Sequence, residues 1–171
     1  MIVGSIKENT TLEKRVSLTP ESAKNIIGLG LKVCIEKEYA HHLGIKDDEY
    51  QNVGVEIKPS SKDVLNRSNL ITTVNCPLED EIEILKNNTI LIGMLNPSKN
   101  KNLIDKIISK KIKPFSLELL PRITRAQSMD VLSSQSNLAG YRAVVDCVAE
   151  FEKAVPMMMT AAGTVPAAKV L

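Results

Sequence analysis

Short apolar runs alternate with segments of helical pattern along the first two thirds of the chain. Each apolar run is rich in Ile, Val and Thr and has the length of a sheet strand. The predicted strands are Ile2–Ile6, Leu31–Ile35, Leu70–Val74, Thr89–Gly93 and Lys111–Ser116. Strand followed by helix followed by strand predicts an α/β fold with a doubly wound, mostly parallel sheet and helices on both of its faces.

Capping residues mark where the first predicted helix begins and ends. Thr19 is suited to the N-cap, Pro20 to the first helical position, and Gly30 to the end. Two further helices are predicted at residues 79–85 and 100–109. The segment Gly28-Leu-Gly30 lacks the third glycine of a dinucleotide fingerprint and precedes a strand, so it is predicted to be a turn and not a phosphate loop.

The pattern changes from about Ser134. Apolar residues recur there at helical spacing in an unusually broad stripe: Leu138, Tyr141, Val144, Val145, Val148 and Phe151. Such a stripe predicts a helix wedged between two packed bodies. The segment Ala167–Leu171 is expected to open a new strand. We therefore predict an α/β domain over residues 1–133, and over residues 134–171 a connecting helix and the first strand of a missing NAD-binding domain.

Composition narrows the class of protein. The chain has 171 residues, enough for one domain with a buried core. A net charge of +2 and an aromatic content of 3% argue against a nucleic-acid partner. The sequence has no apolar run of the ~18 residues that a membrane span requires, and no signal peptide at its start, so we expect a soluble chain.

Cysteine and histidine spacing gives no metal signature. Cys34, Cys76 and Cys147 are scattered without a CxxC pair, which predicts small buried hydrophobic residues in a reducing compartment. The two histidines, His41 and His42, are neighbours and are expected to point apart, whereas paired metal ligands on a helix stand four residues apart. No metal site is predicted.

The segment Pro121–Ser134 carries the densest set of polar chemistry. It offers the guanidinium donors of Arg122 and Arg125, the amide of Gln127 and the carboxylate of Asp130, with several hydroxyls. Such a set can hold a charged small molecule from several sides. Two simpler interpretations stay open: Asp130 and Ser133 only cap the helix that follows, or the arginine and glutamine are structural.

This segment, together with Tyr141–Ala143 and Ala161–Lys169, resembles the NAD-binding component of proton-translocating NAD(P) transhydrogenases, the alpha subunit in bacteria. That family is related to alanine dehydrogenase, with which Lys7-Glu8 and Glu13–Pro20 are shared, and Asn75–Asp80 is similar. The resemblance implies a Rossmann-like or flavodoxin-like N-terminal domain that stops before the NAD-binding Rossmann domain.

The resemblance also implies a cofactor site. Arg122, Gln127, Asp130 and Ser133 match the transhydrogenase loop that closes over the nicotinamide end of NAD. Arg122 would donate to a carbonyl or phosphate oxygen, and Gln127 would bond the ribose hydroxyls or the carboxamide. Hydride transfer needs alignment of two carbons and no proton donor. No catalytic proton donor is therefore expected.

The implied function is hydride transfer between NAD(H) on this component and NADP(H) on a partner component, while a membrane-spanning partner moves protons. The complete component is expected to be a homodimer at the cytoplasmic face of the bacterial inner membrane, or on the matrix side of a mitochondrial membrane. The 171-residue chain alone is expected to be inactive.

Two alternatives remain. One is an amino-acid dehydrogenase like alanine dehydrogenase, which needs a lysine and a histidine to bind and protonate its keto acid. Local patterns place Asn75 and Asn96 at the corresponding positions, and asparagine exchanges no proton near neutral pH. Arg15 remains, either to hold a carboxylate or to pair with Glu8 or Glu13. The other alternative is a non-catalytic assembly module.

Overall fold

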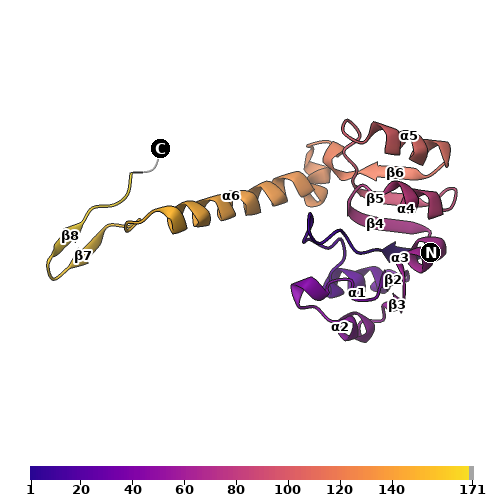
Figure 1. Cartoon of the computed structure of the whole chain (residues 1–171), viewed down its shortest axis with the longest axis horizontal. Helices are drawn as coiled ribbons and strands as arrows, with labels where there is room; N and C mark the ends of the chain where they lie inside the picture. The colour runs from indigo at the N-terminus through magenta and orange to yellow at the C-terminus, as the bar shows by residue number, and fades with distance from the viewer. Residues whose placement is uncertain (170–171) are drawn as a thin grey trace. The chain divides into compact units, whose positions relative to one another are not determined.

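The first 129 residues form an α/β unit around a six-stranded parallel sheet. The computed structural model describes residues 1–169 and divides the chain into Met1–Met129 and a unit that begins at Asp130. The sheet has the order β3-β2-β1-β4-β5-β6 (Figure 1). This confirms the predicted doubly wound fold. The strands are β1 (Ile2–Ser5), β2 (Lys32–Glu36), β3 (Glu56–Lys58), β4 (Leu70–Asn75), β5 (Ile90–Met94) and β6 (Lys113–Ser116).

Helices cover both faces of this sheet, because successive strand residues point to opposite sides. Val33 and Ile35 of β2 belong to one buried cluster, and Cys34 between them belongs to the other. The first cluster includes residues of α1 (Pro20–Gly28) and α2 (Asp47–Asn52). The second includes residues of α3 (Ser61–Arg67), α4 (Glu79–Ile84) and α5 (Lys101–Ser109). Three short 3-10 turns complete the unit: η1 (His41–Leu43), η2 (Leu117–Leu119) and η3 (Thr124–Met129).

The strand order reverses between β1 and β4. The chain builds outward from β1 through β2 to β3, then returns to the other side of β1 and builds outward again through β5 to β6. The connections that follow β1 and β4 therefore leave the sheet in opposite directions. In open parallel sheets this reversal point leaves a crevice outside the carboxyl ends of the strands, where ligands bind.

The predicted ends of α1 are confirmed. The hydroxyl of Thr19 accepts a hydrogen bond from the backbone N–H of Ser22 at 3.2 Å, and the Ser22 hydroxyl accepts from the Thr19 N–H at 2.8 Å. Gly30 turns the chain into β2 with a φ of 81°, a left-handed conformation that glycine adopts without strain. In β1, Gly4 allows close approach of α3, because a Cβ at that position would collide with the side chain of Ser68.

Three short elements of the first unit were not predicted: α2, β3 and α3. Strand β3 has only three residues, two of them charged, so it lacks an apolar run. Strand β6 begins two residues later than predicted because Lys111 has a φ of 56° and still belongs to the preceding turn. Tertiary pairing stabilises β3 where its local sequence does not. Helix α3 has a local signal that was missed, because the Ser60 side chain caps it by accepting the backbone N–H of Asp63.

The second unit consists of a long helix and a hairpin. Helix α6 (Val131–Glu150) begins three residues before Ser134, because Asp130 caps it. An antiparallel hairpin of β7 (Met158–Thr160) and β8 (Gly163–Val165) follows, which the sequence did not predict. Residues 166–169 have no regular structure. The rest of the predicted strand Ala167–Leu171 lies outside the described residues, so that strand stays a prediction.

Helix α6 has no buried residue, so its broad apolar stripe is exposed within this unit. The interpretation of this helix as wedged between two packed bodies therefore remains a prediction. Over residues 1–169, no helix combines the length and the apolar character needed to cross a membrane.

Candidate functional site

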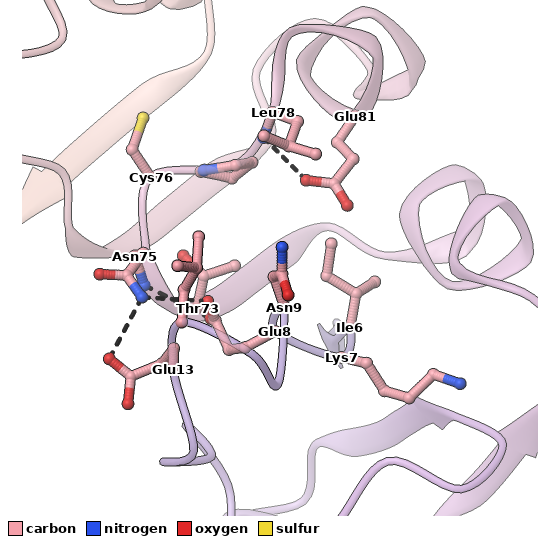
Figure 2. A pocket seen from close by; sticks show the side chains of 12 residues that line it. Ile6, Lys7, Glu8, Asn9, Glu13, Thr73, Asn75, Cys76, Leu78 and Glu81 are labelled. Carbon is pink, nitrogen blue, oxygen red and sulfur yellow. Dashed lines mark hydrogen bonds between the residues drawn. The ribbon is translucent and has the colours of Figure 1, made fainter.

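A cavity of about 360 Å³ opens at the carboxyl ends of β1 and β4, where the strand order reverses (Figure 2). Its position is that of ligand sites in doubly wound sheets, and its volume suits a small organic molecule. Segments far apart in the chain meet there: the loop after β1, the loop after β4 and the start of α4. The lining residues are Ile6, Lys7, Glu8, Asn9, Leu12, Glu13, Thr73, Asn75, Cys76, Pro77, Leu78 and Glu81.

Asn75 joins the two loops that line the cavity. Its side-chain Nδ2 donates to Glu8 Oε2 at 3.3 Å and to Glu13 Oε2 at 3.3 Å. Glu8 also accepts from the backbone N–H of Val74 at 2.7 Å. The amide nitrogen of Asn75 therefore lies between two carboxylates, and its carbonyl oxygen is left as an acceptor.

Glu13 and Arg15 form a two-point ion pair beside this network. Arg15 Nε donates to Glu13 Oε1 at 2.8 Å, and Arg15 Nη2 donates to Glu13 Oε2 at 2.7 Å. The Arg15 guanidinium lowers the pKa of the Glu13 carboxyl to about 2, and Glu13 in turn raises the pKa of Arg15. The interpretation of Arg15 as a partner of a nearby glutamate is thus confirmed for Glu13.

Glu81 and Cys76 line the cavity on the side of α4. Glu81 Oε2 accepts the backbone N–H of Leu78 at 2.8 Å, and burial raises the pKa of the Glu81 carboxyl. Burial, with Glu118 and Glu81 nearby, raises the pKa of the Cys76 thiol to about 11. The thiol is therefore protonated at neutral pH and is not an activated nucleophile.

Two buried tyrosines hold the segment that leads from the cavity into α1. The hydroxyl of Tyr39 accepts the backbone N–H groups of Ser17 at 3.0 Å and Leu18 at 3.3 Å, and lies 2.8 Å from Ser5 Oγ at the end of β1. The hydroxyl of Tyr50 donates to the backbone oxygen of Leu18 at 2.9 Å. The two rings meet edge to face with centroids 5.9 Å apart.

Sequence reasoning missed both tyrosines and also Glu81. The tyrosine hydroxyls bind backbone groups more than 20 residues away, and no local pattern signals such a contact. For Glu81 a signal was available. The resembling segment Asn75–Asp80 ends one residue before it, and Glu81 occupies the third position of the predicted helix at residues 79–85.

Asn96 does not accompany Asn75 into the cavity. It follows β5, is exposed, and is absent from the lining. Its backbone has a left-handed φ of 46°, and its N–H donates to Glu118 Oε1 at 2.5 Å. The hydroxyl of Ser116 donates to the same oxygen at 2.7 Å. Asn96 therefore belongs to a turn built around Glu118.

The structure places Arg122 and Gln127 on an exposed turn. Arg122 precedes η3 and Gln127 lies within it, while the buried Ala126 anchors this turn to the unit. Over residues 1–169, neither the Arg122 side chain nor that of Gln127 makes a hydrogen bond, and neither lines the cavity. Both are available to a ligand, and their binding role stays a prediction.

Asp130 and Ser133 cap helix α6. Asp130 Oδ1 accepts the backbone N–H of Ser133 at 2.9 Å, and the Ser133 hydroxyl donates to Asp130 Oδ2 at 2.6 Å. The capping interpretation is confirmed as one role of this pair. Whether the pair also contacts a cofactor stays a prediction.

The cysteine and histidine side chains differ in burial. Within the described range of the chain, no group of three or more His, Cys, Asp or Glu side chains could hold a metal ion. Nε2 of His42 lies 2.8 Å from the backbone oxygen of Lys14. Cys34 is buried as predicted, and Cys76 is half-buried. The prediction of burial is wrong for Cys147, because it lies on α6, which has no buried residue.

Residues 4–139 match the family described as alanine dehydrogenase/PNT, N-terminal domain. The chain belongs to this family. Over its whole length it is 42% identical to the first part of the NAD(P) transhydrogenase subunit alpha of Rhodospirillum rubrum, and 39% identical to the protein of the same name in Rickettsia prowazekii. In each case it covers 46% of the relative. It thus spans about half the length of the curated relatives that it matches.

Solved structures agree with this placement. A transhydrogenase from Sinorhizobium meliloti superimposes with a TM-score of 0.91 and 42% identity, covering 98% of this chain and 50% of that one. Alanine dehydrogenases are more distant. The enzyme of Methanococcus maripaludis is 32% identical over 82% of this chain and 37% of its own length. An L-alanine dehydrogenase structure superimposes with a TM-score of 0.65.

Proposed function

We propose that this chain is the N-terminal portion of the NAD(H)-holding component of a proton-translocating NAD(P) transhydrogenase. The component exchanges a hydride between NAD(H) and NADP(H), with NADP(H) held by a partner component. The observation that carries the proposal is the 42% identity with a transhydrogenase alpha subunit over the entire chain, against 32% over 82% of the chain for an alanine dehydrogenase.

The side chains of the 121–134 segment fit a polar, negatively charged dinucleotide. Arg122 offers planar donors for phosphate or carbonyl oxygens, and Gln127 offers both a donor and an acceptor. Both side chains are exposed and make no hydrogen bond within residues 1–169, so a ligand displaces no existing partner of theirs. Asp130 and Ser133, which already bond each other, fix the start of α6 beside them in sequence.

The nicotinamide ring supplies the hydride chemistry when it is bound. The chain's own contribution is to bind and orient, because hydride transfer depends on close alignment of two carbons. No side chain is needed to give or take a proton.

The proposed assembly follows from the same assignment. The partners are an NADP(H)-binding component and a membrane-spanning component that moves protons, and the complete NAD(H) component is a homodimer. The chain then works at the cytoplasmic face of a bacterial inner membrane, or on the matrix side in a mitochondrion.

The alternative is an amino-acid dehydrogenase like alanine dehydrogenase. Against it, the amide of Asn75 is occupied by Glu8 and Glu13, and Asn96 lies outside the cavity. At positions 75 and 96 a keto acid would therefore find neither a lysine nor a histidine. A non-catalytic assembly role is the remaining alternative.

Hydride transfer in the complete complex tests the proposal. NADH and an NADP analogue with a shifted absorbance are mixed with the assembled components, and reduction of the analogue is followed. We expect turnover that is lost when the component carrying this chain is omitted. A complex that reduces the analogue equally well without it would refute the proposal.

A further inference from the structure

The helices on the two faces of the sheet do not cover the same strands. Residues Val33–Ile35 of β2 are all buried, so both faces of that strand are covered. In β5 the burial alternates instead: Leu91 and Gly93 are buried, whereas Ile90 and Ile92 are only half-buried. Because successive strand residues point to opposite faces, one face of β5 is less covered than the other.

Strand pairing joins the half-buried residues into one surface. Ile90 pairs with Leu70 of β4, and Ile92 pairs with Thr72 of β4 and Phe115 of β6. Residues that pair across parallel strands point to the same face of the sheet. Phe115 is 57% exposed. We call this surface the open face, and it comprises Leu70, Thr72, Ile90, Ile92, Met94 and Phe115.

The connections between these strands lie on the opposite face. Helix α4 joins β4 to β5, and α5 joins β5 to β6. Their Ile82 and Ile107 belong to the buried cluster that contains Leu91, because right-handed crossovers place both helices on that side of the sheet. Helices α1 and α2 lie on the side of the open face, but they contact β2 and β3 in the other half of the sheet (Figure 1). Within residues 1–129, the crossovers therefore supply no helix to the open face.

The open face has the composition of a protein interior. All-parallel sheets occur almost only where both faces are covered, and their strands carry near-continuous apolar runs. Ile90–Met94 is such a run and lacks the alternation of apolar and polar residues that a strand with one face in water shows. Large apolar side chains left half in water forgo the free energy that their burial provides. The strand sequence therefore predicts a cover that residues 1–129 do not supply.

We propose that a helix from the part of the polypeptide that lies beyond this chain in its longer relatives packs on the open face and completes the first unit. The inference rests on the proposed function, in which this chain is the N-terminal portion of a larger component. The chain covers 46% of the Rhodospirillum rubrum relative, so that protein has enough further polypeptide. The helix presents an apolar stripe to Ile92 and Phe115 and a polar face to water.

A permanently attached segment suits this surface better than a separate partner. Surfaces that bind and release partners are about as polar as the rest of a protein surface. The open face carries one polar side chain, that of Thr72, and its hydroxyl already lies 3.0 Å from Ser17 Oγ. A partner that dissociates would expose the apolar side chains of this face each time, whereas a segment of the same polypeptide stays in place.

A photo-reactive side chain on the open face identifies what covers it. Phe115→p-benzoylphenylalanine is introduced into the complete NAD(H) component, which is prepared without its partner components. Irradiation is followed by denaturing gel analysis and peptide mass spectrometry. We expect a cross-link within one polypeptide, from position 115 to residues beyond this chain. The same substitution at Ile108, which is 61% exposed on α5 at the opposite face, is the control and should give no cross-link to that segment.

Thiol labelling measures the cover independently. In the complete component, Phe115→Cys should react with a maleimide at least about tenfold more slowly than Ile108→Cys, because the proposed helix must first move away. In this chain the two native side chains are similarly exposed, at 57% and 61%, so without the helix the two rates would be similar. Buried Cys34 stays unlabelled as long as the first unit is folded, which separates cover from unfolding.

Equal labelling rates, or the absence of a cross-link from position 115, would overturn the inference. So would a cross-link that joins two polypeptides or stays within residues 1–171, because a second copy or this chain itself would then cover the face. The hydride-transfer assay separates this inference from the proposed function. An active complex with an uncovered face would refute only the inference, whereas a covered face in a complex that transfers no hydride would refute only the proposed function.

Discussion

Glu13 and Arg15 stand two residues apart and bond each other through both carboxylate oxygens, at 2.8 and 2.7 Å. The backbone N–H of Arg15 donates to the same carboxylate at 2.9 Å. This local pair occupies the guanidinium face that a ligand carboxylate would otherwise use. It also ties the loop after β1 to Asn75, because Glu13 accepts from that amide as well.

The pair predicts how stability depends on pH. Glu13 has a folded-state pKa of about 2 against an ordinary value of 4.5. Its stabilising contribution is therefore fully present above pH 4.5 and is lost as the pH falls toward 2. Glu13→Gln should lower the free energy of unfolding at neutral pH by about 1 kcal/mol and flatten its decline across that window. Urea unfolding at a series of pH values measures both effects, with the exposed Glu152→Gln as control. If the free energy of unfolding of Glu13→Gln fell with pH as steeply as that of the unchanged chain, the lowered pKa of Glu13 would be contradicted.

The tyrosine contacts predict a difference between two conservative substitutions. Tyr39→Phe leaves two backbone N–H groups, those of Ser17 and Leu18, without their acceptor. Tyr50→Phe leaves only the Leu18 oxygen without its donor. We expect destabilisation of about 2–3 kcal/mol for the first and about 1 kcal/mol for the second. Denaturant unfolding gives the free energies. Amide hydrogen exchange at residues 17 and 18 should accelerate more in Tyr39→Phe than in Tyr50→Phe. If Tyr50→Phe were the more destabilising substitution and accelerated this exchange more, the hydroxyl contacts of Tyr39 would not hold the segment.

The exposed turn predicts a kinetic effect. In the complete complex, Gln127→Ala should slow single-turnover hydride transfer about a hundredfold, because a small misplacement of the reacting carbon is costly. One lost hydrogen bond should weaken NADH binding by only ~0.5–1.5 kcal/mol. Arg122→Ala should behave similarly, with a larger loss of binding because a charge-assisted contact is removed. NADH fluorescence gives the affinity. Ser128→Ala, on the same turn, serves as the control. If Gln127→Ala and Arg122→Ala both left the rate of hydride transfer unchanged, the turn would only connect two elements and would have no part in positioning the cofactor.

The cavity predicts no alanine dehydrogenase activity. A longer protein that carries this chain should not oxidise NADH with pyruvate and ammonia, since the cavity holds Asn75 where local patterns predict the lysine that would bind the keto acid, and Asn96, at the predicted position of the histidine, lies outside it. The assay follows NADH absorbance, with an authentic alanine dehydrogenase as positive control. Robust turnover would overturn the choice between the two related enzyme classes.

Local patterns determined the alternation of strands and helices in the first unit. The runs at Ile2–Ile6, Leu70–Val74 and Thr89–Gly93 are apolar enough to be strands in any compact fold, and Thr19 with Pro20 marks a helix start by hydrogen bonding within four residues. The three-residue β3 was beyond this kind of inference. It exists because β2 lies beside it and supplies its hydrogen-bond partners.

The polar contacts of the site depend on the tertiary structure and not on local sequence patterns. The sequence by itself determined that position 75 is an asparagine, that an arginine and a glutamine precede a capped helix, and that no complete glycine fingerprint is present. Only the tertiary structure brought Glu8 and Asn75, 67 residues apart, into contact, and left Asn96 outside the cavity. The physical reason is that helix caps and strand propensities act over a few residues. Distances between side chains at the edge of a sheet depend on strand order and on the course of every connection.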